Sequence, residues 1–300
     1  MSAPRLLARG SLALLAIFLG LPAASADPEI RAVDDRGREI ALAKPAARIV
    51  SLAPHATELV FAAGAGDRLV GVTTYSDYPE AAKKIPQVGD FGKVDLERIA
   101  RLRPDVVIAW KSGNHPGDLD RLEKLGLKVY VTEPRRLPDI PRLVRALGAL
   151  AGTAAQADRA AGEFERRLAE LKKRYTGQRE VSMFYQIWHE PLMTVNREHI
   201  ISDVIALCSG RNIFANAGAL TPTVSAENVL TGNPEAIIAS GALYNDERQW
   251  EAWRRFPQVK AVKNRRLFFI HPDLIQRPTP RLLEGAKQMC EQLDEVRRTR

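Results

Sequence analysis

One amphipathic stretch, residues 154–175, limits the folds open to this chain more than any other feature. It contains no Pro and a single Gly, and charged residues fill many of the positions between its apolar ones. The apolar positions fall mostly three and four residues apart and are Ala157, Ala160, Ala161, Phe164, Leu168 and Leu171. This spacing predicts one amphipathic helix of about six turns, roughly 33 Å long at 1.5 Å per residue.

Short apolar segments alternate with helical segments on both sides of this helix. Before it, we expect strands at 48–52, 69–73, 105–109 and 128–131, and helices at 55–63, 95–102 and 116–125. After it, we expect strands at 181–187, 236–239 and 267–270, and helices at 199–208 and 280–296. Such alternation predicts parallel βαβ units, and nearly continuous apolar strands predict sheets that are covered on both faces.

The predicted fold is therefore an α/β protein with two Rossmann-like lobes joined by one long α-helix. We expect the N-terminal α/β lobe to span residues 47–152, the connecting helix residues 153–177 and the C-terminal α/β lobe residues 178–300. The preceding residues, 27–46, are expected to form a polar leader.

An internal repeat supports two related lobes. Residues 94–99 followed by 104–109 match residues 224–229 followed by 234–239, with an offset of 130 residues throughout. Each copy predicts a short helix, a turn that begins with Pro, and a buried strand. A single match of this kind can arise by chance in an α/β protein. The two copies lie on either side of the long helix, however, which favours duplication of a lobe.

The first 26 residues have the pattern of a secretory signal peptide. Arg5 and Arg9 give a positive start, residues 12–21 form an apolar run, and residues 24–26 (Ala-Ser-Ala) offer a cleavage site. The apolar run is too short to span a bilayer, which argues against the alternative of a membrane anchor. We expect residues 1–26 to be cleaved and the mature protein to be soluble in the periplasm.

The charge balance is basic but does not indicate a nucleic-acid partner. The formal net charge is +8, and it falls to +6 when Arg5 and Arg9 leave with the signal peptide. In a cytosolic protein a basic patch would suggest nucleic acid. Export removes that partner, and the charges are mixed along the chain, so we expect a solvated basic surface and no nucleic acid.

The chain has two cysteines, Cys208 and Cys290. An even number in an oxidising compartment favours a disulfide, which would close a loop of about eighty residues and stabilise the fold by roughly 4–5 kcal/mol. Two buried free thiols are the alternative. A two-cysteine metal site is disfavoured because neither cysteine has a Cys or His nearby at ligand spacing.

Aromatic residues follow several of the expected strands. In open parallel sheets the ligand crevice lies beyond the carboxyl ends of the strands. Tyr75, Trp110 and Trp188 each follow an expected strand end. Phe91 lies in the loop before the first copy of the repeat. An aromatic residue at a strand exit often only covers the core. Several together predict flat walls for a large planar or apolar ligand.

Two charged residues follow the last expected strand. Asp273 offers an acceptor, and Arg277 offers a guanidinium fork that suits an anionic group of a ligand. A surface ion pair is the alternative for Arg277.

Glu97 and Glu227 occupy matching places in the two copies of the repeat. Each lies in the first turn of its expected helix, where an acid also simply stabilises the helix dipole. If the lobes are related by pseudo-symmetry, the two acids form a matched pair on one face. Such a pair suits basic residues of a two-fold symmetric partner, as a dimeric membrane permease would supply.

Catalytic signatures are absent from the sequence. It has no Walker A motif, no Gly-x-Ser-x-Gly elbow and no His-Glu-x-x-His motif. The five histidines show no short ligand spacing, although any one of them can in principle be an axial ligand to iron or cobalt. We expect a binding protein with no cofactor or bound metal of its own, and an exported α/β enzyme is the alternative.

The chain resembles the vitamin B12-binding periplasmic proteins of cobalamin ABC importers from about residue 48 to about residue 293. The most specific stretches are 48–54 with 57–59, 75–79, 96–99 through 108–110, 208–210 with 212–214, and 273–281. The wider class, in which one long helix joins two α/β lobes (class III periplasmic binding proteins), also contains haem and ferric-siderophore binders. Phe91 stands where the family has a Trp beside the first docking helix, and Thr221-Pro222 stands where it has a Trp shortly before the second docking glutamate. Trp188 stands where the family has a small residue.

The resemblance implies a specific assignment of roles. Tyr75, Phe91 and Trp110 would line a corrin pocket from the N-terminal lobe, with Asp273 and Arg277 contacting the ligand from the other lobe. Trp188 would contribute from another direction.

The resemblance also implies partners. Glu97 and Glu227 would dock on arginines of an ABC permease dimer in the inner membrane, and Cys208 and Cys290 match the family's disulfide. The ligand would be cobalamin or a related corrinoid, with haem or a ferric siderophore as the alternative. The long helix would limit lobe motion.

Overall fold

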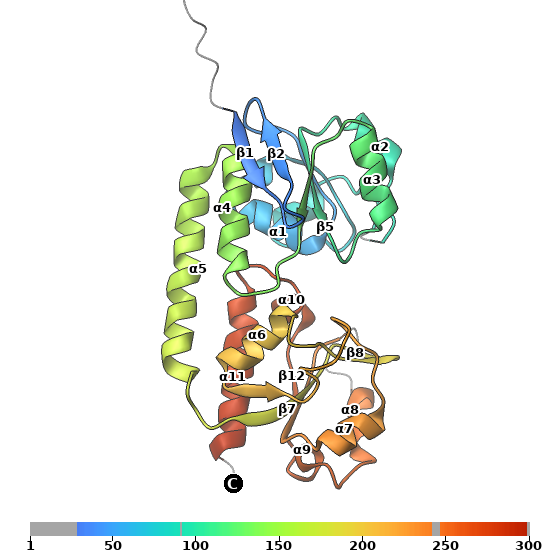
Figure 1. Ribbon diagram of the computed structural model, residues 1–300, viewed down its shortest axis with the longest axis vertical. Coiled ribbons are helices and arrows are strands. Elements are labelled where there is room, and N and C mark those ends of the chain that lie inside the picture. Colours follow the sequence, from blue (N-terminus) through green and yellow to red (C-terminus); the bar gives the residue numbers. More distant parts are fainter. Residues whose placement is uncertain (1–28, 91, 242–246, 299–300) are drawn as a thin grey trace, which may run out of the picture.

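The computed structural model describes residues 29–90, 92–241 and 247–298. The expected signal peptide, residues 1–26, and the expected ligand residue Phe91 lie outside these ranges. Within them the chain forms two α/β lobes beside a long helix, α5 (Figure 1), which confirms the predicted fold class. None of the helices in these ranges is both long enough and apolar enough to cross a membrane.

The N-terminal lobe is built on a four-stranded parallel sheet. Its strands lie in the spatial order β4-β3-β5-β6 and comprise Leu69–Val72, Ile49–Ser51, Val106–Trp110 and Val129–Thr132. The helices that cover it are α1 (Pro54–Ala62), α2 (Leu96–Arg101), α3 (Pro116–Lys124) and α4 (Asp139–Ala151). Short 3-10 turns, η1 (Gly66–Arg68) and η2 (Glu80–Lys84), flank β4.

Both faces of this sheet are buried, as its apolar strands require. Val106 and Ile108 of β5 join a core that includes residues of α1 and α4. Val107 and Ala109 point the opposite way and join a core that includes residues of α2 and α3. The alternation of side chains along a strand thus places one pair of helices on each face.

The C-terminal lobe repeats this arrangement. Its parallel strands lie in the order β10-β7-β11-β12 and comprise Gly210–Asn212, Val181–Gln186, Ala236–Ala239 and Leu267–Phe269. Its helices are α6 (Ile200–Leu207), α7 (Ala226–Gly232), α8 (Glu247–Arg254), α9 (Lys260–Lys263), α10 (Pro272–Ile275) and α11 (Leu282–Arg298). In both lobes the main strands, numbered by their order along the chain, lie second-first-third-fourth, which supports duplication.

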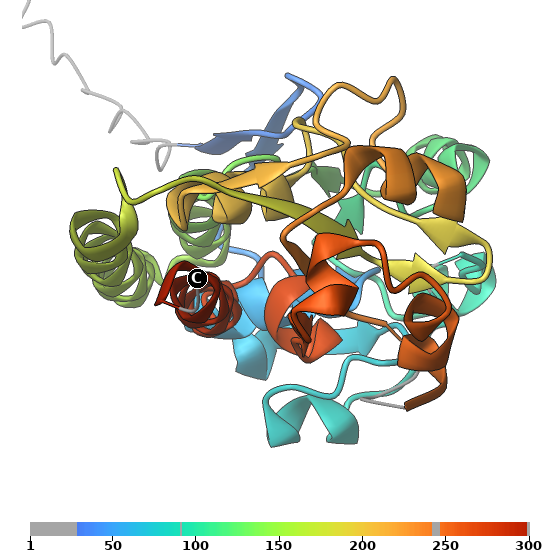
Figure 2. The same ribbon diagram turned by 90° about the horizontal axis from the view of Figure 1, so that it is seen from below.

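The connecting helix α5 spans Ala154–Tyr175, the residues that the sequence predicts. Figures 1 and 2 both place it along one side of the molecule. Its buried residues are Ala157, Ala161, Phe164, Leu168 and Tyr175. They belong to one continuous apolar core that includes residues of both lobes. The lobes are therefore packed together on the α5 side and are not independent bodies on a flexible linker.

The structure corrects the predicted polar leader at 27–46. In its place, β1 (Ile30–Val33) and β2 (Glu39–Leu42) form an antiparallel hairpin on the N-terminal lobe. The sequence signal of such a hairpin is weak, because strand preference depends on the residues that pack against it, and these lie far along the chain.

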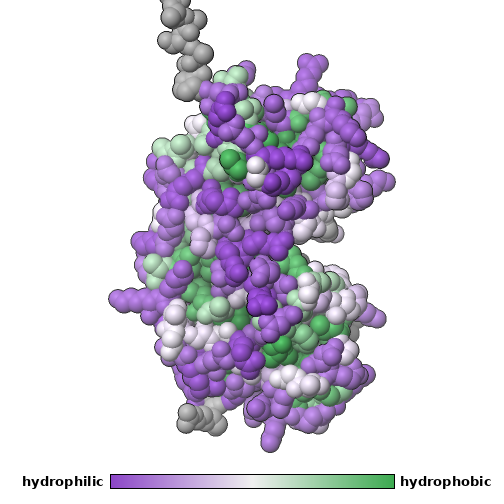
Figure 3. All heavy atoms as spheres, viewed as in Figure 1, coloured by the Kyte–Doolittle hydropathy of each residue, from purple (hydrophilic) through white to green (hydrophobic). Residues whose placement is uncertain are grey.

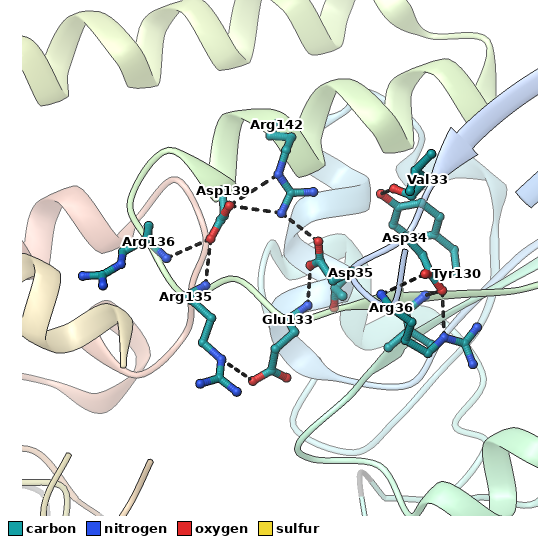
Figure 4. Close-up of polar contacts among 12 residues, drawn as sticks. Val33, Asp34, Asp35, Arg36, Tyr130, Glu133, Arg135, Arg136, Asp139 and Arg142 are labelled. Atoms are coloured by element: carbon teal, nitrogen blue, oxygen red, sulfur yellow. Dashed lines mark hydrogen bonds and ion pairs between the residues drawn. The ribbon is translucent and has the colours of Figure 1, made fainter. Parts of the chain in front are cut away.

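Figure 4 shows how the turn after β1 is fixed to β6 and α4. The backbone N–H of Asp35 donates to the carbonyl oxygen of Val131 at 2.9 Å, and its carboxylate binds Arg142 at 2.8 Å. The hydroxyl of Tyr130 donates to the carbonyl oxygen of Val33 at 3.1 Å. The N-terminal lobe therefore begins with this hairpin and not after it.

Two further differences concern the N-terminal lobe. The helix α4 has no counterpart among the predicted helices, because Pro138 and Pro141 lie at its start and read as helix breakers. Proline is tolerated in a first turn, where the backbone N–H has no partner within the helix. Trp110 is the last residue of β5 and not the residue after it.

The predicted disulfide is confirmed. Cys208 ends α6, Cys290 lies within α11, and both are fully buried. Their Cα atoms are 4.7 Å apart across a sequence separation of 82 residues. The bond therefore ties together two helices that pack on the same face of the C-terminal sheet.

The contact between α4 and α5 provides a test of this packing. A Cβ atom added at Gly148 would lie 2.2 Å from the Cβ of Ala157, whereas one added at Gly162 would meet nothing within 4 Å. We expect Gly148→Ala to lower the free energy of unfolding by about 1–3 kcal/mol, because the helices must move apart. Gly162→Ala, the matched control, should raise it by about 1 kcal/mol. Urea denaturation measures both, and equal effects would contradict the close contact.

Candidate ligand-binding cleft

Residues at the carboxyl ends of strands from both lobes meet around one cavity between the lobes. The cavity has a volume of about 40 Å³. The N-terminal lobe lines it with Trp110, Glu133 and Arg135, and the C-terminal lobe with His199 and Gln276, among others. Figure 3 shows that the molecular surface is hollowed between the lobes on the side away from α5. This is where parallel α/β sheets bind their ligands.

Amide side chains, one buried (Asn114) and one half-buried (Gln276), tie the strand ends together at this cleft. In the N-terminal lobe the Oδ1 of Asn114 accepts from the backbone N–H of Trp110 at 2.7 Å, and its Nδ2 donates to the carbonyl oxygen of Leu52 at 2.9 Å. In the C-terminal lobe the Nε2 of Gln276 donates to the carbonyl oxygens of Ile187 and Ser240, at 3.2 and 2.6 Å. Each amide thus holds the ends of two adjacent strands in register.

An ionic cluster joins the lobes across the cleft. The Nη1 of Arg277 lies 2.6 Å from Asp77 and 3.1 Å from Glu58, and its Nη2 lies 2.9 Å from Asp273. Arg281 binds the same Glu58 through two bonds, of 2.6 and 3.0 Å. Glu58 lies on α1 and Asp77 follows β4, whereas the two arginines follow α10. Two guanidinium groups of one lobe therefore meet two carboxylates of the other.

The part of this cluster around Glu58 is largely shielded from water, whereas the side chain of Asp77 is 43% exposed. The side chain of Glu58 is 3% exposed, and those of Arg277 and Arg281 are 13% and 17% exposed. Burial alone would raise the pKa of Asp77, but the hydrogen bond and charge of Arg277 outweigh it and hold that pKa below its usual value. The pair therefore stabilises the folded state above an unfolded-state pKa of about 3.9, and this contribution is lost as the pH falls through the folded-state value.

Aromatic groups surround the cluster. The guanidinium of Arg281 lies 3.8 Å from the centre of the Tyr78 ring. The ring of His55 meets that of Trp110 edge-on, with centroids 5.2 Å apart. Burial, with the positive charge of Arg277, lowers the pKa of His55 to about 3. His55 is therefore neutral at physiological pH, packs edge-on against Trp110, and places its Nε2 3.4 Å from the Oγ1 of Thr132.

Of the three predicted aromatic ligand residues that the structure describes, only Trp110 lines the cavity. Trp110 is half-buried and lines the cavity. Tyr75 is 69% exposed and has a left-handed backbone, with φ of 63°, which turns the chain sharply after β4. Trp188 is 39% exposed, and its Nε1 donates to the carbonyl oxygen of Glu190 at 3.0 Å. It belongs to the small hairpin of β8 (Trp188–His189) and β9 (Leu192–Met193), which Figure 1 shows beside the space between the lobes.

The two predicted polar ligand residues lie next to each other. Asp273 and Arg277 form an ion pair, and the guanidinium of Arg277 also binds two carboxylates of the N-terminal lobe. The positive charge of Arg277 at the cleft is therefore already neutralised by carboxylates of the protein.

Sequence reasoning assigned no role to Glu58, Asp77 and Arg281. For Glu58 a signal was present, because it is an acid on a short helix that is otherwise apolar around it, which indicates a buried ion pair. The partners could not be read from the sequence, since Arg277 lies 219 residues further along the chain.

The two repeat glutamates are exposed at equivalent positions. Asp95 caps α2 by accepting from the N–H of Arg98 at 2.9 Å, and Ser225 caps α7 in the same way. Glu97 pairs with Arg101 at 2.7 Å on the helix surface. The hydrogen bond from Ser225 is the main cause that lowers the pKa of Glu227. Figure 1 shows α2 and α7 on the side of the molecule away from α5.

Among the residues that the structure describes, no group of three or more His, Cys, Asp or Glu side chains is arranged to hold a metal ion.

Breaking the ionic cluster should destabilise the protein. In Glu58→Gln, two largely buried guanidinium groups lose their shared carboxylate, so we expect the free energy of unfolding to fall by about 3 kcal/mol. The control is Glu80→Gln, which removes a pair with Lys83 whose glutamate side chain is 80% exposed. That variant should change stability by less than about 0.5 kcal/mol. Denaturant unfolding compares the two, and equal stabilities would show that the cluster contributes nothing.

The matching family and relatives agree with this geometry. Residues 49–274 match the model of a family described as periplasmic binding protein. A vitamin B12-binding protein of Vibrio parahaemolyticus is 37% identical over 257 residues, which cover 86% of this chain and 93% of the relative. One of Vibrio cholerae is 38% identical over 246 residues, covering 82% of this chain and 88% of the relative.

Solved structures show the same fold. The periplasmic vitamin B12 binding protein BtuF of Vibrio cholerae matches with a TM-score of 0.79 and 37% identity, over 84% of this chain and 98% of that chain. The periplasmic heme-binding protein RhuT of Roseiflexus sp. RS-1 matches with a TM-score of 0.73 and 22% identity, over 83% and 98%. At this lower identity the match shows the fold alone. With its two duplicated lobes, connecting helix and interlobe cleft, the chain belongs to the periplasmic binding protein family.

Proposed function

We propose that the chain is exported to the periplasm, captures cobalamin or a related corrinoid between its lobes, and delivers it to an ABC permease dimer in the inner membrane. Two observations together support the proposal. The chain has a cleft between its lobes, and it is 37% identical, over 86% of its length, to a vitamin B12-binding protein. As a member of this family, it serves as a substrate-binding component of transport and not as an enzyme.

The surface around the cleft suits a large ring-shaped ligand. Tyr75, Tyr78 and Trp188 are 69%, 45% and 39% exposed, which is unusual for large aromatic side chains. Because they follow the carboxyl ends of β4 and β7, we expect them to border the cleft together with Trp110. Exposed aromatic groups gathered at one site indicate a binding surface.

The size of the cavity indicates how such a ligand sits. Ligand pockets have volumes on the order of 300–1,000 Å³, whereas the cavity between the lobes has about 40 Å³. One edge of the ligand would enter this cavity, and the remainder would lie in the open hollow between the lobes. The continuous core on the α5 side keeps the lobes from separating widely, so a small opening motion suffices.

The charges around the cleft favour a neutral ligand periphery. Arg277 and Arg281 face three carboxylates, and Arg135 binds Glu133 at 3.1 Å. These arginines are already matched, so an anionic ligand group would have to displace a carboxylate. The periphery of a corrinoid carries mainly neutral amides, whereas haem carries two anionic propionates. The ionic cluster therefore supports a corrinoid over haem.

Haem is the second candidate, and Tyr75 is the residue that favours it. Its phenol is largely exposed at the cleft, where it can reach a ferric iron. Haemin should then give a Soret band that is lost in Tyr75→Ala.

Calorimetric titration with cyanocobalamin, cobinamide and haemin separates these candidates. We expect cyanocobalamin to bind at micromolar concentration or tighter. Trp188→Ala removes an exposed wall residue without disturbing the core, so it should weaken binding by about tenfold. Haemin is expected to give no Soret band that depends on Tyr75. Absence of cyanocobalamin binding at micromolar concentrations would refute the corrinoid assignment.

Reversing the docking charges should separate capture from delivery. In the double variant Glu97→Lys, Glu227→Lys, two acids on the surface away from α5 become basic and would repel permease arginines. We expect cyanocobalamin affinity to stay within about twofold and uptake through the cognate permease to be lost. The control is Glu163→Lys with Glu170→Lys on α5, which should retain uptake. Weakened ligand binding in the docking variant would instead refute the docking role.

A further inference from the structure

His199 is a further residue of the cavity between the lobes. It precedes the first residue of α6 and lines the cavity between the lobes, opposite Trp110 and Glu133 of the N-terminal lobe. Nothing in the aromatic walls or the ionic cluster involves it. Its role rests on the proposed function, because it concerns which ligand edge that same cavity accepts.

The backbone of α6 fixes which nitrogen of His199 carries the proton. The Nδ1 of His199 accepts a hydrogen bond from the backbone N–H of Ile201 at 3.2 Å and so caps the helix. A ring nitrogen that accepts a hydrogen bond carries no proton. In the neutral imidazole of His199 the proton is therefore on Nε2. His115 and His271 cap α3 and α10 in the same way, also at 3.2 Å.

His199 is also held neutral. Burial, with the positive charge of Arg135, lowers its pKa to about 4. Around pH 7 it therefore presents a neutral N–H group and not a positive charge. None of the hydrogen bonds made among the described residues uses its Nε2.

Two other polar side chains that line the cavity, Glu133 and Gln276, already have partners within the protein. One carboxylate oxygen of Glu133 accepts from the backbone N–H of Ser112 at 3.0 Å, and the other binds Arg135 at 3.1 Å. The side-chain nitrogen of Gln276 is committed to the strand ends of its own lobe. The Nε2–H of His199 is thus a donor available to a ligand in this cavity.

We propose that His199 is a specificity-determining residue that donates a hydrogen bond from Nε2 to a carbonyl oxygen on the ligand edge seated in the interlobe cavity. Carboxamide side chains on the rim of a corrinoid provide such oxygens. Coordination of the ligand's metal by this nitrogen would require the proton to move to Nδ1, which would break the cap of α6. In this proposal His199 contacts the periphery of the ligand and does not coordinate its metal.

The test compares two cap-preserving substitutions. Serine is a strong N-cap residue, so His199→Ser keeps the cap of α6 while removing the Nε2 donor. His115→Ser makes the same exchange at the exposed cap of α3, outside the cavity. We expect both variants to keep the wild-type melting temperature. Affinity for cyanocobalamin should fall about three- to tenfold in His199→Ser, the effect of one neutral hydrogen bond, and stay unchanged in His115→Ser.

The outcomes separate this inference from the function on which it rests. If wild type and His199→Ser bind cyanocobalamin equally, the donor role is overturned while the corrinoid assignment stands. If the wild type does not bind cyanocobalamin, both are overturned. Titration with aquocobalamin, whose axial water can be replaced, gives an independent readout. An imidazole-coordination change in its visible spectrum that disappears in His199→Ser would also overturn the donor role.

Discussion

The carboxylate of Glu58 is the centre of the ionic link between the two lobes at the cleft. It lies on the buried side of α1 and binds two guanidinium groups that belong to the other lobe. On the opposite side of the molecule, α4, α5 and residues of both sheets share one apolar core. The lobes are thus held at two places, by packing on one side and by charge at the cleft. Contacts at both places limit how far the lobes can move apart.

The cleft is polar beneath and aromatic at its rim, and these parts have different tasks. The amides of Asn114 and Gln276 hold the strand ends, and the ionic cluster links the two lobes. In the proposed function, the exposed rings of Tyr75 and Trp188 would add apolar contact area for the ligand.

Sequence reasoning predicted what local patterns control. The helix α5 has the predicted bounds because its periodicity is complete within its own 22 residues. The alternation of strands and helices and the repeat at 130 residues likewise gave the lobes and the fold class. The β1–β2 hairpin was missed because its burial depends on Tyr130 and Val131, about a hundred residues away. The roles of Glu58 and Arg281 were missed for the same reason. Arg277 was recognised as a cleft residue, but the carboxylates that occupy it appear only in three dimensions.

The position of the disulfide bond between Cys208 and Cys290 also affects the cleft. It joins the end of α6 to α11, and the other end of α6 carries His199 into the cleft. The chain that leads into α11 carries Arg277 and Arg281. The bond therefore braces the two elements of the C-terminal lobe that carry His199 and the cluster arginines. Without it, α6 and α11 could shift relative to each other, and the positions of His199, Arg277 and Arg281 would shift with them.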